Sequence, residues 1–142
     1  MTTTTSTPLP LPTPLSAPFW DGCRRGELLV QKCRDCGGLT FIPQVACMHC
    51  LSPELEWVRS SGRGSVYSYT VVWRPQMPAF EVPYVVALVE LDEQPGLVLL
   101  ANIVQVAPDR VEIGMRVDVT FENRGDHVVP QFRPSESVAT SP

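Results

Sequence analysis

The segment 33–50 reads Cys-Arg-Asp-Cys-Gly-Gly-Leu-Thr-Phe-Ile-Pro-Gln-Val-Ala-Cys-Met-His-Cys, and its four cysteines fall into two pairs. Two residues separate Cys33 from Cys36, and two separate Cys47 from Cys50. A pair with this spacing can hold one metal ion from a tight turn, and four thiolates are a common structural ligand set for zinc. We therefore predict that these four cysteines bind one structural zinc ion.

The ligand set limits what this metal can do. Sulfur would occupy all four positions, so no coordination site stays open for catalysis. A rubredoxin-type iron site has the same ligands and remains an alternative. His49 lies inside the second pair, and we expect it near the surface and outside the ligand set. Gly37 suits the left-handed turn after the first pair, whereas Leu51 stands where a glycine would be more comfortable.

The residues before the cysteines predict an arm and a short helix. Residues 1–15 are rich in Thr and Pro and are expected to form a flexible arm, or one that orders on a partner. Ser16 is a candidate N-cap with Pro18 in the first turn, and Gly26 is a plausible stop. The apolar residues at helical spacing are Phe19, Trp20 and Cys23. We expect the lone Cys23 to be a small apolar contact rather than a nucleophile.

Short strands flank the cysteine pairs, and a longer β region follows them. Near the cysteines, strands are predicted at 28–32, 39–42 and 55–58. A Ser/Gly-rich junction at 60–64 suggests a domain boundary. Beyond it, alternating β-formers predict five strands, at 66–73, 84–91, 97–104, 115–121 and 128–132. Five strands in a region of this size suggest a small barrel of the OB type, with room for at most one helical turn in 107–113.

These elements predict a mainly β protein with a short N-terminal helix, a zinc-binding segment and a five-stranded OB-fold barrel. The expected divisions are an arm at 1–15, the helix and zinc segment at 16–60, the barrel at 61–134 and a flexible tail at 135–142. Two small hydrophobic cores are expected, one for each folded part.

Charge and composition argue against several classes of protein. The formal net charge is −4, with 11 basic and 15 acidic residues, and Lys32 is the only lysine. Nucleic-acid binders usually carry a basic stripe, so we expect no nucleic-acid partner. The N-terminal residues resemble no signal peptide, and no apolar run reaches the length of a membrane span. We therefore expect a cytoplasmic protein without a membrane partner. Because thiols stay reduced in the cytoplasm, we expect the cysteines to bind metal rather than form disulfides.

Motifs for independent catalysis are missing from the sequence. The two histidines, His49 and His127, have no evident partner as a general base, and no phosphate-binding or nucleophile motif occurs. Glu81, Glu90 and Asp92 are expected to be solvated side chains at strand ends and turns. The chain is therefore not expected to turn over a substrate alone.

Taken together, the motifs resemble the family in which a rubredoxin-like zinc ribbon is joined to an acyl-CoA-associated OB-fold. The resemblance covers about Pro18 to Pro134. Met48 and Leu51 depart from the second knuckle usual in that family. The motifs that carry the resemblance are 19–20, 26–28, the two cysteine pairs with Gly37, Trp57, 61–72, 83–91 and 113–117.

The resemblance implies a role as an accessory subunit or domain of a thiolase-superfamily enzyme. Such enzymes include acyltransferases and the retro-aldolases of steroid side-chain degradation. It thus implies a hetero-oligomer with a thiolase-like partner, and acyl-CoA contact through that complex. A stand-alone OB-fold module that binds acyl-CoA or nucleic acid is the alternative. The side chains expected to supply a docking surface are Phe19, Trp20, Trp73, Met77 and Phe80.

Overall fold

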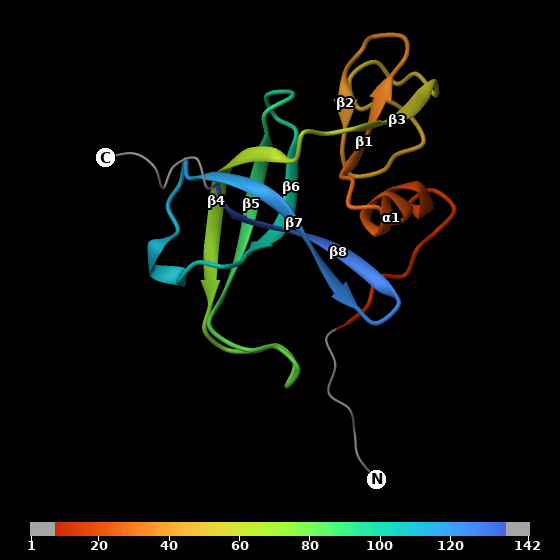
Figure 1. Ribbon diagram of the computed structural model, residues 1–142. Helices are drawn as coiled ribbons and strands as arrows, with labels where there is room; N and C mark the ends of the chain where they lie inside the picture. The colour runs from red at the N-terminus through yellow and green to blue at the C-terminus, as the bar shows by residue number, and fades with distance from the viewer. Residues whose placement is uncertain (1–7, 136–142) are drawn as a thin grey trace.

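The computed structural model describes residues 8–135. Nearly all of the predicted tail at 135–142, and about half of the predicted arm at 1–15, therefore lie outside the described residues. Within the described part, no helix is both long enough and apolar enough to cross a membrane. The chain forms a small three-stranded ribbon, one short α-helix and a barrel (Figure 1).

Helix α1 spans Ala17–Arg24, with Pro18 in its first turn. Ser16 occupies the predicted N-cap position, but its side chain makes no capping hydrogen bond. Ser16 is already in a helical backbone conformation, and its Oγ accepts a hydrogen bond from the N–H of Thr13 at 2.9 Å. A capping side chain normally needs an extended backbone to reach the next turn. Gly26, with φ of 76°, follows the helix as expected.

Three short antiparallel strands form the ribbon in the order β2-β1-β3. They are β1 (Leu29–Cys33), β2 (Leu39–Thr40) and β3 (Leu55–Arg59). The predicted second strand, 39–42, is thus shortened to two residues. After Thr40 the chain leaves the sheet, and the ring of Phe41 packs at 5.4 Å from that of Phe19 in α1.

Five strands close into a barrel, as the sequence predicts, and their order in it is β4-β5-β6-β8-β7. A register shift between Val66 and Ser68 marks a bulge in β4, which helps a long strand to bend around the barrel. β6 and β8 pair in parallel, and the other pairs are antiparallel. The expected helical turn is η1 (Pro108–Arg110). The strands are β4 (Arg63–Val72), β5 (Tyr84–Leu91), β6 (Val98–Ile103), β7 (Arg116–Arg124) and β8 (His127–Pro134).

The ribbon and the barrel share one hydrophobic core. Phe19 of α1 and Leu28 and Val30 beside it belong to the same buried cluster as Val89 and Phe132 of the barrel. Figure 1 shows α1 lying between the ribbon strands and the β7–β8 hairpin, and α1 contacts both β1 and β8. The expectation of two separate small cores is therefore wrong, because α1 joins them.

Candidate metal centre

The four predicted cysteines meet in one cluster. All four Sγ atoms lie within 4.8 Å of one another. The Sγ atoms of Cys33 and Cys50 are 3.5 Å apart, and those of Cys36 and Cys47 are 3.6 Å apart. A tetrahedral zinc with Zn–S bonds near 2.3 Å would separate its sulfurs by about 3.8 Å. The cluster is therefore a site of the right size and chemistry for one metal ion.

Two equivalent turns present these sulfurs. In the first, which follows β1, the N–H of Cys36 donates to Cys33 Sγ at 3.4 Å and the N–H of Gly37 donates to the Cys33 carbonyl at 2.9 Å. The second turn lies between β2 and β3. There the N–H of His49 donates to Cys47 Sγ at 3.3 Å, and the N–H of Leu51 donates to the Cys47 carbonyl at 2.9 Å. Sequences that differ outside the cysteines thus adopt one local geometry.

The surroundings hold the pKa of the Cys33 and Cys47 thiols below the ordinary value and that of the Cys36 and Cys50 thiols above it, so they favour the thiolate form only at the first two sulfurs. Backbone N–H donation, led by Cys36, holds the pKa of the Cys33 thiol below its ordinary value despite the opposing effect of burial. Cys33 and Cys47 are buried, whereas Cys36 and Cys50 are exposed. The site therefore has an inner half against the protein and an outer half near solvent.

His49 contributes no atom to the sulfur cluster. Its Nε2 lies 3.0 Å from the carbonyl oxygen of Leu39 and 3.3 Å from Nε2 of Gln94. Gln94 also accepts from the N–H of Leu39 at 2.8 Å and donates to its carbonyl at 2.9 Å. The β5–β6 hairpin of the barrel thus braces the ribbon beside the cluster. No signal in the sequence marked Gln94 for this role.

The remaining candidates for chemistry are dispersed. Burial raises the pKa of the Cys23 thiol to about 12, so this side chain is a protonated apolar contact at neutral pH. Asp92 pairs with Arg116, whose hydrogen bonds hold the pKa of that carboxyl below its usual range. Glu90 accepts from the N–H of Gly96 at 3.0 Å, and His127 pairs with Arg124 across the β7–β8 ladder.

The residues predicted for a docking surface divide into two groups. Phe19 is only 5% exposed and belongs to the core, so its assignment to a surface is wrong. Trp20 is half-buried against it, with ring centroids 4.9 Å apart. Trp73 and Met77 are 69% and 42% exposed, respectively, in the loop between β4 and β5, where Phe80 is half-buried.

A four-cysteine ribbon braced against a closed five-stranded barrel defines the class of this protein. Residues 20–56 match the family model described as ChsH2, rubredoxin-like zinc ribbon domain, and residues 57–122 match that described as ChsH2, C-terminal OB-fold domain. The chain belongs to this ChsH2-type DUF35 family. The resemblance seen in the sequence is thereby confirmed.

Known relatives include subunits of larger enzymes. The chain is 44% identical over 119 residues to a probable enoyl-CoA hydratase alpha subunit from Thermomonospora curvata, but spans only 37% of that relative's length. A 62-residue match at 39% identity links it to the benzoylsuccinyl-CoA thiolase subunit BbsA of Geobacter metallireducens, covering 44% of this chain and 41% of that one. A solved structure, the Ltp2-ChsH2(DUF35) aldolase, superposes with a TM-score of 0.80 and 40% identity, covering 89% of this chain and 98% of that one.

Proposed function

We propose that this chain is a zinc-binding accessory unit that docks on a thiolase-like acyl-CoA enzyme, an aldolase or an acyltransferase, and supports its activity. The observation that carries the proposal is the match to the Ltp2-ChsH2(DUF35) aldolase, which covers 98% of the chain matched there. The dispersed carboxylates and the buried, protonated Cys23 support a non-catalytic role for this chain itself.

Zinc is the metal proposed for the four-sulfur cluster. Cys33, Cys36, Cys47 and Cys50 would hold it, and their sulfur spacing fits a tetrahedral ion. A bound zinc would cross-link the two turns of the ribbon and leave no position open for substrate. Metal analysis of protein purified without added metal should therefore give one zinc per chain. One equivalent of iron would instead identify a rubredoxin-type centre.

The loop between β4 and β5 is the proposed docking surface for the enzyme partner. Trp73 and Met77 project from a segment that contains Pro75, Pro78 and Pro83. Exposed aromatic residues and methionine are enriched at the centres of protein interfaces. Such residues also contribute a large share of binding free energy when they become buried. This loop therefore offers an apolar anchor that the protein's own core does not use.

The test measures the binding of this chain to a purified thiolase-like subunit from the same organism. The double variant Trp73→Glu, Met77→Glu should weaken binding by about 100-fold or more, because two apolar anchors would be lost. The partner's aldolase or acyltransferase activity should fall in parallel, while the metal content stays at one equivalent. Calorimetry, gel filtration and activity assays measure these effects.

Ile113→Glu is the matched control, because Ile113 is 70% exposed but lies in another loop. It should leave binding unchanged. A partner that is fully active alone and still co-elutes with the double variant would overturn the docking proposal. The stand-alone binding-module alternative would then replace it.

A further inference from the structure

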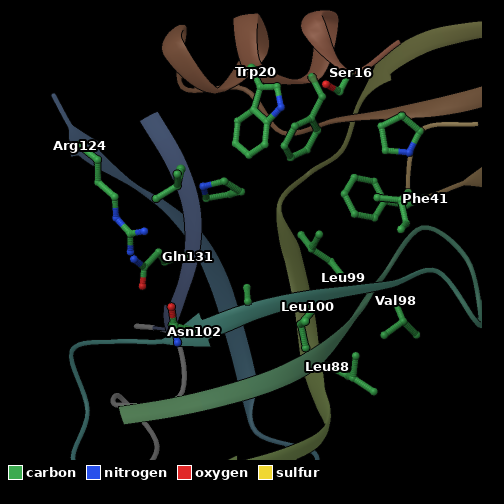
Figure 2. A pocket seen from close by; sticks show the side chains of 16 residues that line it. Ser16, Trp20, Phe41, Leu88, Val98, Leu99, Leu100, Asn102, Arg124 and Gln131 are labelled. Carbon is green, nitrogen blue, oxygen red and sulfur yellow. The ribbon is translucent and has the colours of Figure 1, made fainter. Parts of the chain in front are cut away.

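The barrel has an open seam between β6 and β8. Within the described residues, the two strands pair only at Ile103 and Phe132, where the N–H of Val104 donates to the Phe132 carbonyl at 2.8 Å. Before this point a cleft of about 560 Å³ lies between them, and α1 and residues 41–43 supply its other walls (Figure 2). The seam therefore leaves one edge of each strand unpaired along the cleft.

The wall that β6 gives to this cleft is the edge of the strand. All five residues of the range 98–102 line the cleft. The side chains of neighbouring strand residues point to opposite faces of a sheet, so one face alone cannot supply five consecutive residues. The backbone edge of β6 is therefore open to the cleft.

The direction of each backbone group in β6 follows from the two ends of the strand. The Leu97 carbonyl accepts from the N–H of Leu91 in β5 at 2.9 Å, whereas the N–H of Val104 donates to β8. Because successive strand residues direct their backbone groups to opposite edges, odd-numbered residues bond to β5 and even-numbered ones face the seam. The N–H and C=O groups of Val98 and Leu100 therefore point into the cleft, where no described strand pairs with them.

Of the two edges at the seam, that of β6 is the one suited to a further strand. Residues 98–102 contain no proline, charge or bulge, the features that usually protect a strand edge. In β8, Pro130 lies two residues before Phe132, so it shares the edge that faces the seam and has no N–H to offer. An incoming strand would thus pair with β6, beside Leu100, which is 65% exposed and directly opposite Leu88.

The arm before α1 has a complementary pattern. Its prolines at 8, 10, 12 and 14 alternate with other residues, and each proline favours an extended conformation in the residue before it. In an extended segment, Leu9 and Leu11 present their N–H and C=O groups on one edge, while the prolines take the other edge and offer no N–H. The arm can therefore pair as a strand on one side only.

The arm is not paired in this chain. Leu9 and Leu11 are 46% and 89% exposed, and their N–H groups have no hydrogen-bond partner within residues 8–135. None of residues 8–15 lines the cleft of its own chain. No charged side chain occurs before Asp21, so the arm could enter an apolar cleft without desolvating a charge.

We propose that residues 8–12 of a second copy of this chain form an additional strand on the open edge of β6. Leu9 and Leu11 match the two-residue spacing of Val98 and Leu100. Four backbone hydrogen bonds can therefore form between the arm and the edge.

The side chains of this added strand also suit the cleft. Directly opposed residues share a face of the sheet, so the arm's leucines would extend the exposed apolar row formed by Leu88 and Leu100. Figure 2 shows Trp20 and Phe41 across the cleft from these two leucines. The leucines of the arm would be buried between these rings and the sheet.

The exchange is reciprocal in a two-fold symmetric dimer. Ser16, where the arm meets α1, itself lines the cleft. The step from Leu11 to Ser16 is five residues and spans at most about 18 Å. The two clefts must therefore lie close together, as in the self-complementary contact of a two-fold dimer. The proposed docking loop contributes no residue to the cleft and stays available to the enzyme partner.

Sedimentation equilibrium of the metal-loaded full chain tests the proposal, and the parent chain should show a monomer–dimer equilibrium. The double variant Leu9→Pro, Leu11→Pro removes both donors of the pairing edge and should raise the dimer dissociation constant by about 100-fold or more. Pro10→Leu is the matched control, because it adds an N–H on the opposite edge and should leave the constant nearly unchanged. A parent chain that is monomeric at every concentration, or a double variant that dimerises equally well, overturns the proposal.

Two further measurements locate the contact. Amide hydrogen exchange at Val98 and Leu100 should be slow in the dimer and fast in the double variant. Leu100→Lys changes the receiving edge at an exposed position, so it should keep its metal but fail to dimerise. Mixing it with the double variant should give a heterodimer, because one intact arm then meets one intact edge. Equal exchange in the parent chain and the double variant, or no heterodimer from two folded variants, overturns the proposal. If Leu100→Lys does not fold, the exchange measurement decides alone.

Discussion

Gly37 and Leu51 hold equivalent positions in the two cysteine turns, yet only one of them is suited to its backbone. Their φ angles are 76° and 66°, in the left-handed region. Leu51 is 78% exposed, so its side chain gains little from burial. A non-glycine residue in this conformation costs about 1–2 kcal/mol. The cysteine spacing predicted both turns. The structure shows that the second turn forms although Leu51 takes the unfavourable left-handed conformation.

Exchanging the two residue types tests this cost directly. Gly37→Leu should lower the free energy of unfolding of the metal-loaded protein by about 1–2 kcal/mol, because open space around Gly37 leaves only the backbone penalty. Leu51→Gly should be neutral or stabilising by up to about 1 kcal/mol, since the added chain entropy of glycine offsets part of the relief. Urea unfolding measures both. Equal destabilisation by the two changes would contradict the equivalence of the turns.

The strands of the ribbon are too short to stabilise its fold by themselves. β2 has two residues, and β1 and β3 have five each, so few side chains are available for a core. Cys33 is the last residue of β1, and the other three cysteines lie in irregular turns. Metal binding would therefore supply most of the ribbon's stability.

Cys36→Ser should remove the metal and unfold the ribbon, because structural zinc contributes on the order of 10 kcal/mol in small domains. Metal analysis and hydrogen exchange of residues 29–59 measure the loss. Cys23→Ala is the control, since it removes a thiol that lies outside the cluster and should retain one metal equivalent. A full equivalent of metal in Cys36→Ser would refute the assignment of this ligand.

Across the whole molecule, the two halves are coupled by the shared core and by the tip of the β5–β6 hairpin. Gln94 makes both backbone hydrogen bonds to Leu39, and the carboxylate of Glu93 accepts from Ser60 and Ser61 at the start of the barrel. Loss of the metal should therefore lower the stability of the barrel. A chelator should lower the midpoint of barrel unfolding as well as that of the ribbon.

Gln94→Ala should weaken this coupling. The change leaves the N–H of Leu39 without its partner, while the Leu39 carbonyl keeps its contact with His49 Nε2. The loss costs about 1–3 kcal/mol if the N–H does not reach water. Metal release and barrel unfolding, followed by a colorimetric zinc indicator and by near-UV circular dichroism, should coincide in the parent chain and separate in the variant. Transitions that are already separate in the parent chain would show that the halves unfold independently.

Much of the fold was predictable because its signals are local. The cysteine spacing identified the ribbon, and alternating β-formers placed all five barrel strands to within a few residues. Errors arose where a tertiary contact, or another local hydrogen bond, replaced the expected one. The Ser16 side chain accepts a hydrogen bond from Thr13 instead of capping α1. Phe41 lies outside β2 because its ring packs against that of Phe19, and Phe19 itself belongs to the common core.

Local signals were enough to identify the four cysteines of the candidate metal site, because ligands two residues apart are held together by the covalent chain. They were also enough to locate the strands, because side-chain alternation is a property of the extended backbone. Folding is what brings Gln94 to a backbone group 55 residues away and buries the side chain of Gln131. Those contacts depend on barrel closure and on the packing of α1 against it, and no short-range pattern encodes either one.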